Sequence, residues 1–160
     1  PWPAERVFHK GKDFGGGADT YLQEIQRKIL PEAECLLPFL PKYRVIAGYS
    51  LAGLCSLYAI YRMSSFQRVV CASASLWYDN FGDFMRENPI LCLPEKIYFS
   101  LGKKEKMAKN QRMAVVEDRM KAAVIFLQQQ GIQTIFEENP GGHFQEPIGR
   151  LAKGIRWAVI

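Results

Sequence analysis

Four short apolar runs recur along the chain and are separated by longer stretches with helical periodicity. The runs have the length of strands and are rich in β-branched and aromatic residues: 44–47, 68–72, 96–101 and 133–136. Because most of them are apolar without alternation, they indicate parallel strands that are covered on both faces.

The stretches between the runs space their apolar residues by three and four, as helices do. The expected helices are 22–31, ending near Pro31, then 51–61, 113–127 and 148–158. The second is apolar around most of its circumference and should be the most enclosed. The last should bury Ile148, Leu151, Ile155 and Ala158 and place Arg150, Lys153 and Arg156 toward water. Strand and helix alternate, so the sequence predicts an α/β fold with helices on both faces of a parallel sheet.

The composition fits one globular domain spanning residues 1–160, since 48% of the residues are apolar and 23% are charged. Gly53 and Ser56 interrupt the longest apolar stretch, so we expect no membrane-spanning helix, and no signal peptide is evident. The four cysteines contain no C-x-x-C pair, which favours reduced thiols and a cytoplasmic location.

The net charge of +5 permits anionic partners, but the basic residues are scattered apart from the run 103–112. Glu105 interrupts that run and no aromatic residue alternates with it, so we expect no nucleic-acid partner. The three glycines at 15–17 lack the Gly-Lys-Ser/Thr ending of a phosphate loop. His, Cys and carboxylate residues show no metal-ligand spacing, so we expect no metal and no other cofactor.

The segment Gly48-Tyr49-Ser50-Leu51-Ala52 follows an expected strand and precedes the enclosed helix. This strand-turn-helix context is the one that a nucleophile elbow, G-x-S-x-G, requires. Small residues two before and two after the serine avoid a collision across the sharp turn, although Ala52 departs from the strict glycine. Ser50 would then project from the carboxyl edge of the sheet, with the Leu51 N–H aimed at the same point as an oxyanion donor. The alternative is a serine that simply caps a helix.

Chain order supports the elbow, because hydrolases of this type place their residues in the order serine, acid, histidine. The chain has two histidines. His9 precedes every expected strand of the sheet, whereas His143 follows the last one, after Gly141 and Gly142. We therefore expect His143 to act as general base and then general acid toward Ser50.

The acid partner of His143 is less well defined by the sequence. Glu105 lies just past the strand 96–101, at the edge where a carboxylate could orient the imidazole. Asp79, after the strand 68–72, is an alternative, and a Ser-His dyad without a strong third member is another.

Taken together, these motifs resemble the putative esterase family of α/β-hydrolases, which includes esterase D and the enterochelin and related siderophore esterases. The resemblance covers nearly the whole chain and rests on five segments in order: 13–22, 46–53, 73–78, 101–105 and 142–144. It implies an α/β-hydrolase fold with Ser50 as nucleophile, His143 as base and Glu105 as acid. It also places Trp77 near the substrate pocket, and we expect Tyr49, next to the serine, to contact substrate as well. A purely structural role in the core would explain Trp77 equally well.

The sequence departs from the family in its number of strands, because the four expected here all correspond to the carboxyl half of the fold. The family sheet normally has more strands, and the early ones carry a loop that supplies the second oxyanion donor. We therefore expect this chain to correspond to the carboxyl-terminal two-thirds of the fold, with that donor outside it. The strand at Arg44 would then form an exposed edge, which leaves pairing into a homo-oligomer open.

Three functions follow from these features. The first is hydrolysis of a small-molecule carboxylic ester through an acyl-enzyme on Ser50. The second keeps the serine but transfers the acyl group to an alcohol or thiol. The third is a catalytically silent domain that keeps the fold for binding or assembly.

Overall fold

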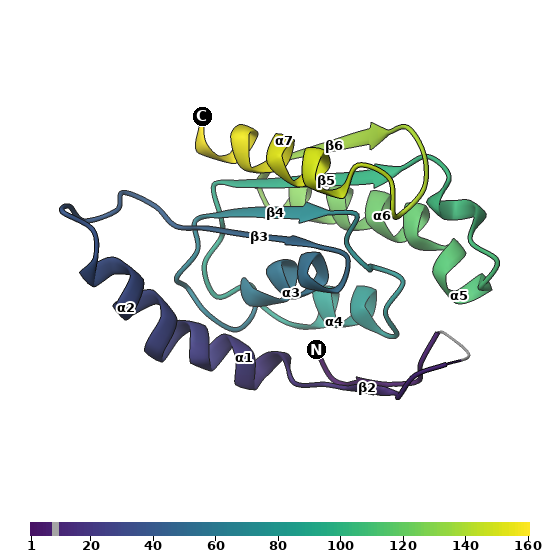
Figure 1. The fold of residues 1–160 in the computed structure, drawn as a ribbon, viewed down its shortest axis with the longest axis horizontal. Coiled ribbons are helices and arrows are strands. Elements are labelled where there is room, and N and C mark those ends of the chain that lie inside the picture. Colours follow the sequence, from purple (N-terminus) through teal and green to yellow (C-terminus); the bar gives the residue numbers. More distant parts are fainter. Residues whose placement is uncertain (8–9) are drawn as a thin grey trace.

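A computed structural model describes residues 1–7 and 10–160, so His9 lies outside the described residues. Its centre is a parallel sheet in the order β3 (Val45–Tyr49), β4 (Arg68–Ala72), β5 (Lys96–Gly102) and β6 (Gln133–Asn139). These are the four strands that the sequence predicts. The strands point the same way, so their carboxyl ends form one edge of the sheet (Figure 1). β3 is an edge strand, as expected.

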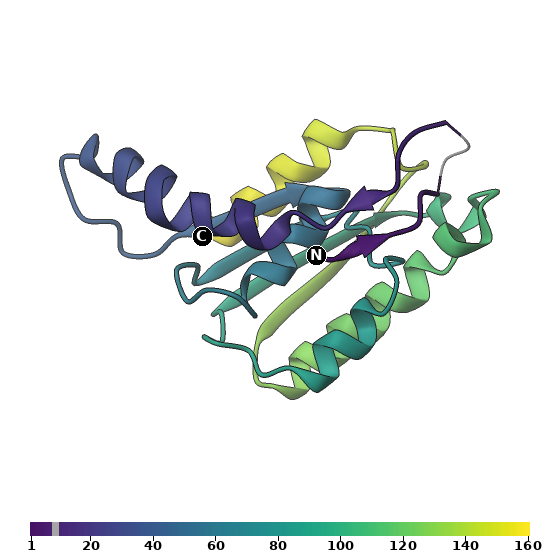
Figure 2. The same ribbon diagram turned by 90° about the horizontal axis from the view of Figure 1, so that it is seen from below.

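Helices cover both faces of this sheet, which confirms the predicted α/β architecture (Figures 1 and 2). On one face, α3 (Leu51–Ala59) packs on β3 and β4, while α6 (Val116–Gln129) packs on β5 and β6. On the other face, α7 (Pro147–Val159) packs on β3, β4 and β5. The larger core lies on the α3 and α6 side, where Leu57 and Leu127 are fully buried. α4 (Phe81–Glu87), which the sequence did not predict, packs against α6.

The amino-terminal segment forms a small antiparallel pair, β1 (Pro3–Ala4) and β2 (Phe14–Gly15), before the first helix. That helix was expected to end near Pro31, and this prediction is wrong. α1 (Ala18–Glu24) passes through a π-helical turn, η1 (Ile25–Ile29), into α2 (Leu30–Cys35). The Leu30 N–H donates to the carbonyl of Ile25, and this wider turn lets the helix continue into a residue that lacks an N–H.

The helix expected over 113–127 is divided in two. α5 (Gln111–Ala114) is a single turn that Asn110 caps by accepting from the Arg112 N–H at 3.0 Å. α6 then starts after Val115, whose ψ of 1° lies outside the helical range. α5 packs against η2 (Glu105–Met107), a short 3-10 helix that follows β5. Glu117 and Lys121, four residues apart on α6, form an ion pair at 2.6 Å.

The buried face of α7 differs from the expected one. Arg150 was expected to face water, but only 1% of it is exposed, whereas Ile148 is 83% and Ile155 40% exposed. The buried face contains Arg150, Gly154 and Ala158, at a spacing of four. Gly154 explains the close approach, because a Cβ there would lie 2.4 Å from Cγ1 of Val70. The helix therefore packs on the sheet through its small residues and not through its isoleucines.

Across the described ranges, 1–7 and 10–160, no helix has both the length and the apolar character needed to cross a bilayer.

Candidate active site

Ser50 lies in a strained turn between β3 and α3. Its φ of 58° and ψ of −122° are rare for a residue with a side chain. The turn is fixed by three backbone hydrogen bonds. The Ser50 N–H donates to the carbonyl of Ala72 at 3.1 Å, and the Ser50 carbonyl accepts from Leu54 at 3.0 Å and from Ser75 at 3.1 Å. This bend presents the Ser50 side chain at the carboxyl edge of the sheet.

Gly48 makes the bend possible. A Cβ on Gly48 would lie 2.2 Å from the carbonyl carbon and oxygen of Ala52, which is far inside any allowed contact. Backbone atoms on the other side of the turn occupy the space that a side chain would need. The structure thus shows the collision across the turn that the small residues at positions 48 and 52 were expected to avoid.

His143 reaches Ser50 from the loop between β6 and α7. Its Nε2 lies 2.9 Å from Oγ of Ser50. Several hydrogen bonds brace the loop. The hydroxyl of Tyr49 donates to the His143 carbonyl at 2.5 Å, and Oε1 of Gln145 accepts from the Gly142 N–H at 2.7 Å. Gly141 has a φ of 82°, which a glycine adopts without strain. Two side chains that are 93 residues apart in the chain thus lie within hydrogen-bond distance of each other.

Glu105, in η2, occupies the other side of the imidazole. Its Oε2 lies 2.7 Å from Nδ1 of His143. Its Oε1 accepts from the Gly102 N–H at 2.7 Å and from the Ser73 hydroxyl at 2.9 Å. Burial raises the pKa of Glu105, but the hydrogen bonds from His143, Gly102 and Ser73 outweigh it and hold the pKa below its ordinary value of 4.5. The carboxylate is therefore ionised at neutral pH, and its bond to His143 weakens only as the pH falls below that value.

Asp79, the alternative acid, is engaged elsewhere. Both of its carboxylate oxygens accept from Arg112, at 2.7 and 2.6 Å. Within the described part of the chain, Asp79 makes no hydrogen bond to His143. The structure brings Glu105, and not Asp79, to the histidine.

Two further groups lie beside Oγ of Ser50. α3 begins at Leu51, so the Leu51 N–H belongs to the first turn of a helix, where N–H groups lack intrahelical acceptors. An anionic oxygen formed next to Ser50 would meet the positive end of this helix. The hydroxyl of Ser75, which is buried, lies 3.3 Å from the Ser50 hydroxyl.

Two pockets are lined by residues of this site or by their neighbours in the chain. One, of about 230 Å³, is lined by His143, Glu105 and Lys104 together with apolar side chains: Trp77, Met107, Ala108, Met113, Val116 and Phe144. The other, of about 350 Å³, includes Leu51, Tyr21, Cys55 and Tyr78. Trp77 is only 8% exposed, so it is both part of the core and part of a pocket wall. Tyr49 lines neither pocket, and its hydroxyl instead holds the His143 loop.

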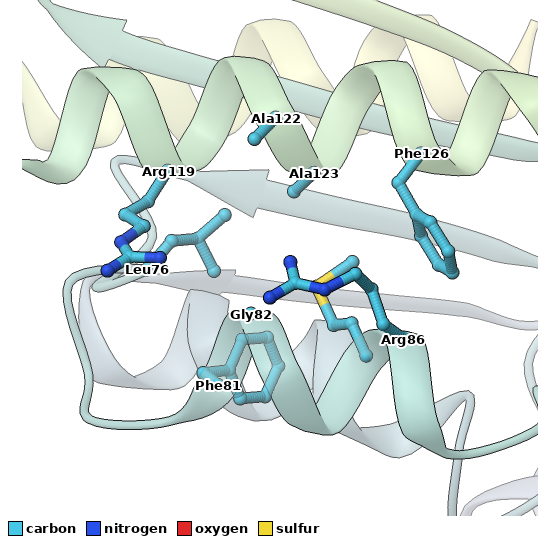
Figure 3. Close-up of a pocket in the computed structure, with 9 residues that line it drawn as sticks. Leu76, Phe81, Gly82, Arg86, Arg119, Ala122, Ala123 and Phe126 are labelled. Carbon is cyan, nitrogen blue, oxygen red and sulfur yellow. The ribbon is translucent and has the colours of Figure 1, made fainter.

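Another pocket lies between α4 and α6, where Arg86 and Arg119 point into the gap above Phe81 (Figure 3). Its volume is only about 40 Å³, far too small for a substrate. None of Ser50, Leu51, Glu105 and His143 lines it. The candidates for substrate binding are therefore the pocket lined by His143 and Glu105 and the pocket lined by Leu51.

Arg150 is the site residue that sequence reasoning missed. It was expected on the wet side of α7, but its guanidinium lies 3.1 Å from Oε1 of Glu105. The available signal was the spacing Arg150, Gly154, Ala158, which puts a long cation on the same stripe as two residues small enough for close packing. Over the residues that the structure describes, no group of three His, Cys, Asp or Glu side chains could hold a metal ion.

The chain was compared with known families and proteins. Residues 1–147 match the model of the family described as Putative esterase. The uncharacterized protein YbbA of Bacillus subtilis (strain 168) is 31% identical over 108 residues, which cover 66% of this chain and 43% of YbbA.

Solved structures with a similar fold include an esterase and the protein SOBER1. The enterochelin esterase from Shigella flexneri superposes with a TM-score of 0.69 at 21% identity, covering 84% of this chain and 36% of that one. SOBER1 of Arabidopsis thaliana, solved as a variant, gives a TM-score of 0.60 at 19% identity, covering 89% of this chain and 64% of its own. At these identities the likeness shows a common fold. The chain spans 43% of YbbA and 36% of the enterochelin esterase.

Proposed function

The chain belongs to the Putative esterase family, and on that premise we propose that it hydrolyses carboxylic esters with Ser50 as the nucleophile. The observation that carries this proposal is the unbroken chain of hydrogen bonds from Ser50 through His143 to Glu105. The two bonds measure 2.9 and 2.7 Å, and each ring nitrogen of His143 takes part in one. A serine hydroxyl, an imidazole and a buried carboxylate in this order are the parts that acyl transfer needs.

In the first half-reaction, Oγ of Ser50 attacks the carbonyl carbon of the ester while its proton passes to Nε2 of His143. The negative charge that develops on the carbonyl oxygen is stabilised by the N–H of Leu51. Glu105 keeps the other ring nitrogen protonated and stabilises the imidazolium. When the ester C–O bond breaks, His143 returns its proton to the departing alkoxide, and the acyl group stays on Ser50.

In the second half-reaction, a water molecule takes the place of the alcohol. His143 removes one of its protons as the oxygen attacks the acyl carbon, and then donates that proton back to Oγ of Ser50 as the acid is released. Every proton is carried by one imidazole, so the reaction needs no other acid or base.

The side chains that line the pocket beside His143 favour binding of esters that have an apolar part. Its wall contains Trp77, Met107 and Met113, and methionine side chains adapt to ligands of irregular shape. A volume of about 230 Å³ suits a short alkyl chain or a single ring. We therefore propose small-molecule esters with an apolar acyl or alcohol group as the substrate class.

A series of p-nitrophenyl esters tests this function. Each methylene that enters the pocket contributes about 0.8 kcal/mol, so kcat/KM is expected to rise roughly fourfold per methylene from acetate to hexanoate, until the pocket is filled. Met113→Gln should flatten this dependence. Ile125→Gln, at a position on α6 that is 56% exposed and outside the pocket, should leave it unchanged.

Two outcomes of this series would count against the proposal. If no ester is hydrolysed faster than in buffer, the chain is not an esterase. If all esters are hydrolysed at one rate in every variant, the pocket beside His143 does not bind the acyl group.

A further inference from the structure

We propose that Arg150 is a positioning residue for the reaction, because one guanidinium holds both the Glu105 carboxylate and the loop that carries His143. This inference rests on the proposed function of the site. Neither the family match nor the reaction proposed for Ser50, His143 and Glu105 assigns a role to this residue.

The contacts of the guanidinium divide between its two terminal nitrogens. Nη1 donates to Oε1 of Glu105 at 3.1 Å and to the Ser73 hydroxyl at 3.0 Å, with the Tyr49 hydroxyl at 3.4 Å. Nη2 donates to the carbonyls of Pro140 at 2.9 Å and Gly142 at 3.0 Å. The first nitrogen therefore binds the acid, and the second binds the residues just before His143.

The chain leaves room for this arrangement. A Cβ on Gly102 would lie 2.9 Å from both Nη1 and Nη2 of Arg150, so the guanidinium lies against the bare backbone at the end of β5. The same glycine donates its N–H to Oε1 of Glu105 at 2.7 Å. Because Gly102 has no side chain, the Arg150 guanidinium and the Glu105 carboxylate can both lie against its backbone.

Stability alone does not account for a buried arginine here. Only 1% of the Arg150 side chain and 5% of the Glu105 side chain are exposed, and replacing such a buried ion pair by apolar residues is often neutral or stabilising. Within the described residues, Nε of Arg150 is buried without a hydrogen-bond partner, which is an added cost. We therefore attribute the presence of Arg150 to the groups that it orients, the Glu105 carboxylate and the loop before His143.

Two members of the hydrogen-bond chain, Glu105 and His143, depend on the guanidinium of Arg150. With Oε1 of Glu105 held by Arg150, Ser73 and Gly102, the other oxygen is directed at Nδ1 of His143. The carbonyls bound by Nη2 flank Gly141, which has a φ of 82° and could adopt other conformations if they were released. Removing the guanidinium would take one hydrogen bond from the carboxylate and two from the loop at once, while the bonds from Gly102 and Ser73 to Glu105 and from Tyr49 to the loop remain.

Charge adds a second effect that kinetics can detect. The groups that face the His143–Glu105 pair are Ser50, Ser73, Tyr49, the Gly102 N–H and the guanidinium of Arg150, and Lys104 lines the same pocket. Among the described residues, Arg150 is the arginine or lysine that forms an ion pair with the buried carboxylate. Without it the pair binds protons more tightly, because a nearby positive charge disfavours the protonated forms. The acid limb of the pH-rate profile should move to higher pH.

Three variants separate position from charge: Arg150→Met, Arg150→Lys and, as matched control, Arg156→Met, which changes an exposed arginine of the same helix. Rates are normalised to the number of serines acylated in the initial burst, so that loss of folded protein does not count. Arg150→Met is expected to lose roughly 10²-fold in kcat, as misplacement of reacting groups by about 1 Å does. Its acid limb should move to higher pH.

Arg150→Lys keeps the charge but cannot bind the carboxylate and two carbonyls in the planar geometry of arginine. It should retain the acid limb of the original protein and lose part of kcat, and it carries the test if Arg150→Met does not fold. Arg156→Met should match the original protein both in kcat and in the acid limb of the pH-rate profile. If Arg150→Lys and Arg150→Met give the control's kcat per active site and the control's pH profile, Arg150 has no positioning role and the proposal is wrong.

Proton NMR tests the positioning role of Arg150 without a measurement of turnover. The chain has only two histidines, so the signal of the His143 Nδ1 proton in its bond to Glu105 can be assigned with His143→Gln. We expect this signal to shift or disappear in Arg150→Met and to persist in Arg156→Met. If the original protein hydrolyses no ester but the signal still responds in this way, the proposed function fails while the positioning by Arg150 stands. An unchanged signal in Arg150→Met would overturn the positioning itself.

Discussion

Ser50→Ala is expected to lower kcat for ester hydrolysis by up to roughly 10⁶-fold, the loss seen when the nucleophile of a serine hydrolase is removed. The substitution deletes the atom that would form the acyl bond and leaves nothing for His143 Nε2 to deprotonate at 2.9 Å. Folding should be preserved, since the backbone strain at a φ of 58° is the same for alanine and serine. Steady-state rates and a urea unfolding curve measure the two effects separately.

Two other serines serve as references for this prediction. Ser64, which is exposed, should tolerate alanine without any change in kcat. Ser75 is the competing candidate, because its hydroxyl lies 3.3 Å from that of Ser50. If Ser75→Ala abolished turnover while Ser50→Ala retained it, the nucleophile would have been assigned to the wrong hydroxyl.

Glu105→Gln is expected to cost about 10⁴-fold in kcat, as the loss of the acid does in a Ser-His-Asp triad. The amide has nearly the same shape as the carboxylate but carries no charge to stabilise the imidazolium. Its NH₂ group, if it faces Nδ1 at 2.7 Å, would favour the tautomer that leaves Nε2 protonated and unable to act as a base. The measurement is kcat near pH 8, where Glu105 of the original protein is ionised.

The matched comparison for Glu105 is Asp79→Asn, which removes the alternative acid. Asp79 is bound to Arg112, so this variant should lose an ion pair that is partly exposed and worth roughly 1 kcal/mol or less. Its kcat should stay close to that of the original protein. A larger loss of kcat in Asp79→Asn than in Glu105→Gln would transfer the role of the acid to Asp79.

The sheet could be predicted from the sequence because the central strands β4 and β5 are buried and contain nearly continuous apolar runs, and because shorter apolar runs mark β3 and β6. Ser50 and His143 could be identified because the strained turn needs Gly48 and because the order of the residues along the chain restricts the choice to one histidine. A residue that a turn requires and the order of residues along the chain can both be read directly from a sequence.

Spatial choices were harder to predict. The sequence left Glu105 and Asp79 open, because both follow strands and only the fold decides which loop reaches His143. Arg150 was predicted to be exposed because charged residues in a helical pattern usually face solvent. In the structure its charge is compensated by Glu105 and by two loop carbonyls. The helix that continues through Pro31 depends on a π-helical turn that has no clear sequence signature.

The most direct measurement of the central claim is labelling with a fluorophosphonate, which reacts covalently with an activated serine, followed by peptide mapping. We expect one adduct per chain, located on Ser50, in the original protein and none in Ser50→Ala. His143→Gln should label far more slowly, because its side chain cannot accept the Ser50 proton. An adduct on another residue, or equal labelling of Ser50→Ala, would contradict the assignment of Ser50 as the nucleophile.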